Sequence, residues 1–232
     1  MSSATLLPKR FTSTVALELA VAVSGLLLVG FIVSHLSANL LVYAGPEYLN
    51  AYAEKMRSLG PLLYVARTGL AAIFIGHIVL AITLARRNRA AREQEYAVSA
   101  SVGRKGAATK YMLYSGLAIF AFLLLHLTDF TLREHHGPNA MVGGEDLGLY
   151  GLVWNFLGNP LRALIYIVAV SAVGLHLSHA ISSVVVTLGW LSERGTQRAE
   201  YIARGIGLVI ALGFASIPIY IIMKTYLMGG HA

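Results

Sequence analysis

The sequence predicts an all-α integral membrane protein, a single bundle of five transmembrane helices formed by residues 1–232. Two observations predict this fold. Hydrophobic residues make up 56% of the chain and charged residues only 12%, with a mean hydropathy of +0.67, a balance that water-soluble domains do not show. The apolar residues also gather into runs that reach the length of about 20 residues needed to cross a bilayer.

Five apolar runs are separated by short segments rich in glycine, proline and charged residues. We expect each run to form one membrane-spanning helix. The first run is too long for a signal peptide, so we expect it to be retained. The runs cover residues 14–43, 62–85, 110–132, 161–190 and 203–227.

The connection over residues 133–160 contains Leu147, Tyr150, Val153, Trp154 and Phe156. This pattern predicts a short helix lying at the membrane interface. The alternative is a plain connector whose aromatic residues sit at the membrane surface.

The orientation follows from the distribution of lysine and arginine. Twelve of the 18 basic residues fall at the N-terminus, in the loop around 86–110 and in the loop around 191–204, and six fall in the other connections. The positive-inside rule therefore predicts a cytoplasmic N-terminus and, with five spans, a C-terminus outside. The same distribution explains the net charge of +7 as a topology signal, so we expect no nucleic-acid partner.

Cysteine is absent from the chain. Disulfides, thiolate-bound iron-sulfur clusters and cysteine-type zinc sites are therefore excluded within it. Histidine is the obvious remaining metal ligand.

Four of the eight histidines lie one in each of the first four apolar runs: His35, His77, His126 and His176. An unpaired polar ring inside a membrane is costly, so it indicates a site. A single such histidine is more often a hydrogen-bonded packing residue, but four on successive helices favour ligands. His179, three residues after His176, is the alternative ligand of the fourth run.

The depth of each histidine follows from helix direction and a rise of about 1.5 Å per residue. His35 and His126 belong to the outer half of the bilayer, whereas His77 and His176 lie nearer the inner face. Two pairs at two heights predict two b-type haems, each iron bound by two imidazoles. A four-histidine metal site would need all four rings at one level.

Small residues near these histidines would leave room for a flat macrocycle. The alternative interpretation is close helix packing between small residues. The glycines concerned are Gly25, Gly30, Gly69, Gly76, Gly116 and Gly174.

Several short motifs accompany the histidines along nearly the whole chain. They are Ser34-His35, the segment Gly-Pro-Glu-Tyr-Leu-Asn-Ala-Tyr at 45–52, Gly76-His77, Leu125-His126, Gly-Leu-His-Leu-Ser-His at 174–179, and Thr-Leu-Gly-Trp at 187–190. With these motifs the chain resembles the cytochrome b membrane-anchor subunit of dihaem succinate:quinone oxidoreductases and fumarate reductases, the complex II family.

The resemblance implies that His35 and His126 bind the iron of the outer haem and that His77 and His176 bind the iron of the inner haem. It further implies a flavoprotein subunit with FAD and an iron-sulfur subunit on the cytoplasmic face, where succinate is oxidised. This chain would pass electrons through two haems b to a quinone, menaquinone in most dihaem anchors of this type. We therefore expect a multi-pass protein of the bacterial inner membrane, in contact with lipid.

A carboxylate near the outer haem would supply protons to the quinone. Glu54 and Asp129 are the candidates, and Asp129 follows His126 by about one helical turn. For each of them, a plain interfacial carboxylate is the alternative.

Two other functions compete with this interpretation. The first is the dihaem cytochrome b anchor of another dehydrogenase, such as a hydrogenase or formate dehydrogenase. The second is a haem-free membrane anchor or transporter, although we identify no internal repeat or discontinuous helix pair that would support a transporter.

Overall fold

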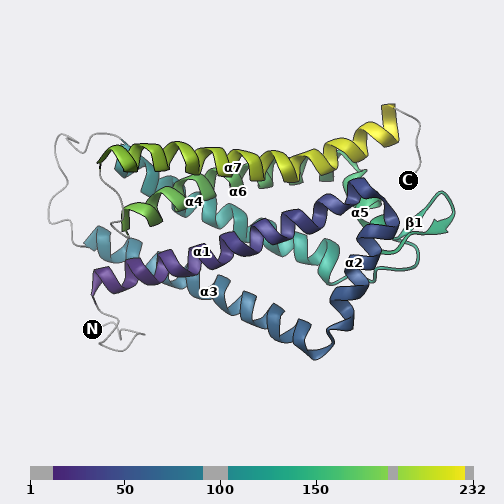
Figure 1. Cartoon of the computed structure of the whole chain (residues 1–232), viewed down its shortest axis with the longest axis horizontal. Coiled ribbons are helices and arrows are strands. Elements are labelled where there is room, and N and C mark those ends of the chain that lie inside the picture. The colour runs from purple at the N-terminus through teal and green to yellow at the C-terminus, as the bar shows by residue number, and fades with distance from the viewer. Residues whose placement is uncertain (1–12, 91–103, 188–192, 228–232) are drawn as a thin grey trace.

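A computed structural model describes residues 13–90, 104–187 and 193–227. Within these ranges, five helices are long and apolar enough to cross a membrane, as the sequence predicted. The spanning helices run lengthwise through the bundle in Figure 1. They are α1 (Thr14–Asn39), α3 (Pro61–Ala90), α4 (Arg104–His126), α6 (Pro160–Thr187) and α7 (Glu193–Ile222).

The last spanning helix begins earlier than the apolar run at 203 that predicted it. Residues 193–202 are mostly polar, yet they continue the helix of the following apolar run. Hydrogen bonding along a helix does not require apolar side chains, so hydropathy marks only the apolar part of α7.

The residues after the first run were predicted only to separate two runs, whereas they form the helix α2 (Pro46–Ser58). A short 3₁₀ turn, η2 (Leu40–Ala44), ends α1, and Gly45 then adopts φ 105°, a left-handed conformation that favours glycine. Pro46 opens α2 at a position where its missing N–H costs nothing. The chain thereby turns sharply out of α1 into α2.

The connection between α4 and α6 contains a π-helical turn, η3 (Leu127–Thr131), and a hairpin of β1 (Met141–Val142) and β2 (Glu145–Asp146). The short helix predicted there is α5 (Gly148–Leu157). Tyr150 and Trp154 are buried in it rather than lying on its surface. They pack in a core cluster with residues of η2, α2, α6 and α7.

The Asn50 side chain joins α2 to α5. Its amide donates to the carbonyl oxygen of Leu147 (2.9 Å), and its oxygen accepts from the backbone N–H of Tyr150 (3.1 Å). Both short helices therefore lie at the same end of the bundle, called here the α2/α5 end (Figure 1).

Helices α6 and α7 approach closely through small residues. A side chain at Gly174 would overlap the carbonyl oxygen of Gly207 and the Cβ of Ala211, and a side chain at Gly207 would overlap Ser178. The prediction that Gly174 makes room for a macrocycle is therefore wrong. Its absent side chain allows helix packing of the kind typical of membrane proteins.

A candidate double histidine site

The rings of His77 and His176 each contact a serine side chain on a neighbouring spanning helix. Ser24 on α1 lies with its Oγ 2.9 Å from Nδ1 of His77 on α3. Ser115 on α4 lies with its Oγ 2.9 Å from Nδ1 of His176 on α6. His77 and His179 both lie within electrostatic range of His176. We call His77 and His176 the serine-bound pair.

A glycine follows each of these serines and leaves space beside the imidazole. A Cβ at Gly25 would lie 3.4 Å from Cε1 of His77, and a Cβ at Gly116 would lie 3.6 Å from Cε1 of His176. Any larger side chain would fill the space next to the ring. These two glycines thus adjoin the serine-bound pair.

His35 on α1 and His126 at the end of α4 face each other with ring centroids 5.7 Å apart and ring planes at 89°. Nδ1 of His126 is buried and has no hydrogen-bond partner. The Asn39 amide nitrogen donates to the carbonyl oxygen of His35 (2.7 Å) and lies 3.3 and 3.4 Å from its ring nitrogens. We call His35 and His126 the aromatic pair, because aromatic side chains surround them.

The aromatic neighbours come from α1, α4, η3, α6 and α7. Phe31 stacks on His35 with centroids 5.3 Å apart, and Phe130 lies 5.3 Å from His126. These rings cover the two imidazoles on several sides. The remaining contacts are those of Phe214 with His35 and of Phe122 and Tyr166 with His126.

The two pairs lie at two levels of the bundle. Ser24 and His35 are eleven residues apart on α1, and Ser115 and His126 are eleven apart on α4. Eleven residues advance a helix by about 16 Å and return to within about 20° of the same face. Both helices therefore present a serine at one level and a histidine at the other, and the aromatic pair lies nearer the α2/α5 end.

These spacings belong to an internal repeat. Residues 24–35 read SGLLLVGFIVSH and residues 115–126 read SGLAIFAFLLLH. The proline that begins α3 precedes His77 by sixteen residues, and the proline that begins α6 precedes His176 by sixteen. A spanning helix, a short helix and a second spanning helix thus occur twice, in α1–α3 and α4–α6, and each histidine pair joins equivalent positions of the two repeats.

This repeat and the serines within it were not predicted from the sequence. The expectation that no internal repeat supports a transporter did not consider this repeat of the histidine positions. The sequence does contain a signal for the repeat. Ser-Gly-Leu occurs at 24–26 and again at 115–117, and in both copies a histidine lies eleven residues after the serine.

Asp129, a carboxylate candidate from the sequence, is buried in η3 with 1% of its surface exposed. Arg162 at the start of α6 binds both of its oxygens through one guanidinium nitrogen, at 2.8 and 2.6 Å. The hydroxyl of Tyr166 donates to the same carboxylate at 2.9 Å. Because Tyr166 also contacts the ring of His126, this ion pair supports the wall of the aromatic pair.

Glu54 and His179 take no part in the hydrogen bonds and ring contacts described for the two pairs. Glu54 is exposed on α2. His179 is exposed on α6, whereas His176 one turn earlier is half-buried and contacts Ser115. These positions favour His176 over His179 as the ligand of the fourth run.

The two histidine pairs fit a haem better than a metal ion bound by several side chains. Among the described residues, no three His, Cys, Asp or Glu side chains come together as a metal site would require. Each pair instead offers two imidazoles from two helices, the ligand set that a haem iron takes. The unpartnered Nδ1 of His126 and the space at Gly25 and Gly116 also fit a bound macrocycle.

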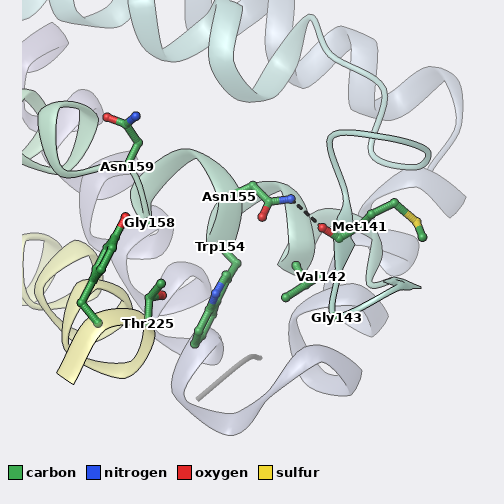
Figure 2. A pocket seen from close by; sticks show the side chains of 9 residues that line it. Met141, Val142, Gly143, Trp154, Asn155, Gly158, Asn159 and Thr225 are labelled. Carbon is green, nitrogen blue, oxygen red and sulfur yellow. Dashed lines mark hydrogen bonds between the residues drawn. The ribbon is translucent and has the colours of Figure 1, made fainter. Parts of the chain in front are cut away.

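A separate cavity of about 390 Å³ opens between the hairpin, α5 and the π-helical turn η4 (Met223–Leu227) that ends α7. Figure 2 shows Trp154 and Thr225 on its wall, with Asn155 donating to the carbonyl of Met141. No histidine of the two pairs lines this cavity. Comparisons of the chain with protein-family models, with curated proteins and with solved structures found no match.

Proposed function

We propose that this protein is the dihaem cytochrome b membrane anchor of a succinate dehydrogenase, a succinate:menaquinone oxidoreductase. His35 with His126 and His77 with His176 would be the axial ligands of its two haems. The observation that carries the proposal is the arrangement of four intramembrane histidines as two cross-helix pairs about 16 Å apart along the bundle. The succinate dehydrogenase assignment depends on the resemblance of the histidine motifs to complex II anchors.

When bound, the two haems would supply one-electron transfer between an iron-sulfur subunit and the quinone. The tasks of the chain itself follow from its contacts. Ser24 and Ser115 hold the rings of the serine-bound pair, and the aromatic side chains keep water from the aromatic pair. Low polarity around a haem is one of the means by which a protein sets its potential.

The charge distribution supports an orientation for this assembly. Arg86, Arg87 and Arg89 end α3 at the pole opposite the α2/α5 end. By the positive-inside rule that pole would be cytoplasmic, and it would receive the iron-sulfur subunit and the FAD-containing flavoprotein. The serine-bound pair would then be the inner site and the aromatic pair the outer site of a bacterial inner membrane.

The quinone would need a carboxylate that exchanges protons with water. Glu54 is the accessible candidate, because its side chain is exposed on α2. Asp129 is engaged by Arg162 and Tyr166, so we propose it as a support of the outer site more than as a proton donor.

The test is a dithionite-reduced minus oxidised spectrum of the purified complex, with haem quantified per chain. We expect two haems in the native protein and one in each of His35→Ala and His77→Ala, with a different haem lost in each. His179→Ala is the matched control and should retain both. The proposal is contradicted if the native protein contains no haem, or if it contains one haem that neither His35→Ala nor His77→Ala removes.

The partner assignment is tested with the same preparation. Succinate should reduce the haems through co-purifying flavin and iron-sulfur subunits. Reduction by formate or hydrogen, with no response to succinate, would identify the anchor of a different dehydrogenase.

A further inference from the structure

Ser24 and Ser115, which contact the serine-bound pair, each have several polar atoms within hydrogen-bonding distance of Oγ, but each hydroxyl has only one hydrogen to donate. Ser24 Oγ lies 2.8 Å from the carbonyl oxygen of Ala20 and 3.0 Å from that of Val21. Ser115 Oγ lies 2.7 Å from the carbonyl oxygen of Tyr111 and 3.2 Å from that of Met112. Carbonyl oxygens only accept, so each hydroxyl hydrogen is donated to its own helix.

The direction of the contact to histidine follows. Oγ has already donated its hydrogen, so at 2.9 Å it accepts a hydrogen from Nδ1 of His77 or His176. The reverse assignment would turn the lone pairs of Oγ toward two carbonyl oxygens at hydrogen-bonding distance. A neutral imidazole that carries its hydrogen on Nδ1 has its lone pair on Nε2.

We propose that Ser24 and Ser115 are positioning residues that fix His77 and His176 in the tautomer that presents Nε2 to a haem iron. The inference rests on the proposed function, because iron is the partner assumed for Nε2. It adds a role to residues that bind no iron themselves.

The arrangement is not a general property of hydroxyl residues in this bundle. Thr68, Thr83 and Ser171 also donate to a carbonyl of their own helix, and the hydrogen bonds described for them end there. Ser24 and Ser115 reach across to another helix, at equivalent positions of the two repeats. The same contact thus occurs twice in independent surroundings.

A hydrogen bond from Nδ1–H makes the imidazole a more basic ligand, which favours ferric over ferrous iron. Loss of the serine should therefore raise the midpoint potential of the haem concerned. A tenfold loss of ferric relative to ferrous affinity corresponds to about 59 mV for one electron. Loss of such an outer partner typically weakens metal binding by roughly 10- to 100-fold.

The experiment is a redox titration of both haems in the intact complex carrying Ser24→Ala, Ser115→Ala or both changes. The haem lost in His77→Ala identifies the one to follow. We expect its potential to rise in each variant and furthest in the double variant, with the other haem unchanged. Ser24→Thr, which keeps a hydroxyl, should restore the native potential, and Ser171→Ala should change neither haem.

Each outcome separates the inference from the function on which it rests. Complete loss of the followed haem in Ser24→Ala, with restoration in Ser24→Thr, also supports the positioning role. Two haems with unchanged potentials in the double variant overturn the inference and leave the proposed function intact. A native complex without two haems overturns the proposed function itself.

Discussion

The serine-bound pair and the aromatic pair each join equivalent positions of the two repeats, yet different forces hold their rings. His77 and His176 are held by hydroxyl groups of neighbouring helices. His126 has a buried Nδ1 without a partner and is surrounded by Phe122, Phe130 and Tyr166. Hydrogen bonds orient the serine-bound pair. Packing orients the aromatic pair, and the buried Asp129–Arg162 ion pair supports that packing.

The difference indicates which changes should affect which pair. A hydrogen bond fixes the rotation of an imidazole and its tautomer, whereas aromatic packing fixes its position and keeps water away. Changes near Ser24 or Gly25 should therefore act on one pair alone, and changes near Asp129 on the other alone.

The largest expected effect is the loss of a whole cofactor from the serine-bound pair. Gly25→Val would place methyl groups in the space beside Cε1 of His77, where even a Cβ lies 3.4 Å from the ring. We expect the variant to bind one haem per chain in place of two, measured by pyridine haemochrome. Gly205→Val on α7 is the control, because Gly205 is not among the glycines expected to make room for a macrocycle and a Cβ there meets no atom within 4 Å; it should retain both haems. Equal haem content in the two variants would show that Gly25 is not needed to leave space for a haem beside His77.

The second largest effect is expected from loss of the Asp129–Arg162 ion pair, which supports the wall of the aromatic pair. Arg162→Met would leave the carboxylate of Asp129 buried with Tyr166 as its only described hydrogen-bond donor. Loss of one partner of a buried pair costs about 3–5 kcal/mol. We expect that loss in the unfolding free energy, measured in detergent, together with a weakened outer haem.

The control for this change is the exposed pair of Arg204 and Glu200, whose charged atoms are 3.8 Å apart. Arg204→Met should cost less than about 1 kcal/mol, because exposed pairs are weak. Similar losses in Arg162→Met and Arg204→Met would contradict a structural role for the buried pair.

A smaller effect is expected from Tyr166→Phe. The variant keeps the ring that contacts His126 and removes the hydrogen bond of 2.9 Å to Asp129. A hydrogen bond to a charged group contributes about 1.5–3 kcal/mol. We expect a loss in that range by thermal or denaturant unfolding, with the spectrum of the inner haem unchanged. A spectral change confined to the inner haem would show that the two sites are not separable in this way.

The smallest effect should be local to the hairpin, far from the serine-bound pair. The backbone N–H groups of Gly137 and Gly148, together with His136, hold the pKa of Asp146 below its usual value of 3.8. The ionised carboxylate therefore stabilises the hairpin above that value, and the contribution is lost as the pH falls through the lowered pKa. Hydrogen exchange at Gly137 and Gly148 should become faster on acidification in the native chain, relative to the intrinsic rate. In Asp146→Asn this acid-dependent change should vanish, and its persistence would exclude Asp146 as the cause.

Much of the fold could be predicted from the sequence because a bilayer demands long apolar runs, and four histidines within them are conspicuous. The helix α2 was missed because PEYLNAYAEKMRS mixes polar and apolar residues and is too short to span. Ser24 and Ser115 were missed because serines are ordinary in membrane helices and bond their own backbone. The partners Asp129 and Arg162 lie on separate elements, so only the folded chain brings them together.

The repeat of α1–α3 in α4–α6 bears on how such a protein can arise. Each histidine pair joins two copies of one position, so a symmetric dimer of a three-helix chain would build both levels from only two histidines per copy. One serine and one glycine per copy would supply the surroundings of His77 and His176 in the same way. Fusion of the two copies then frees each half to change alone. The Asp129–Arg162 ion pair lies in the second half only: the positions matching Arg162 and Tyr166 in the first half hold Leu63 and Arg67.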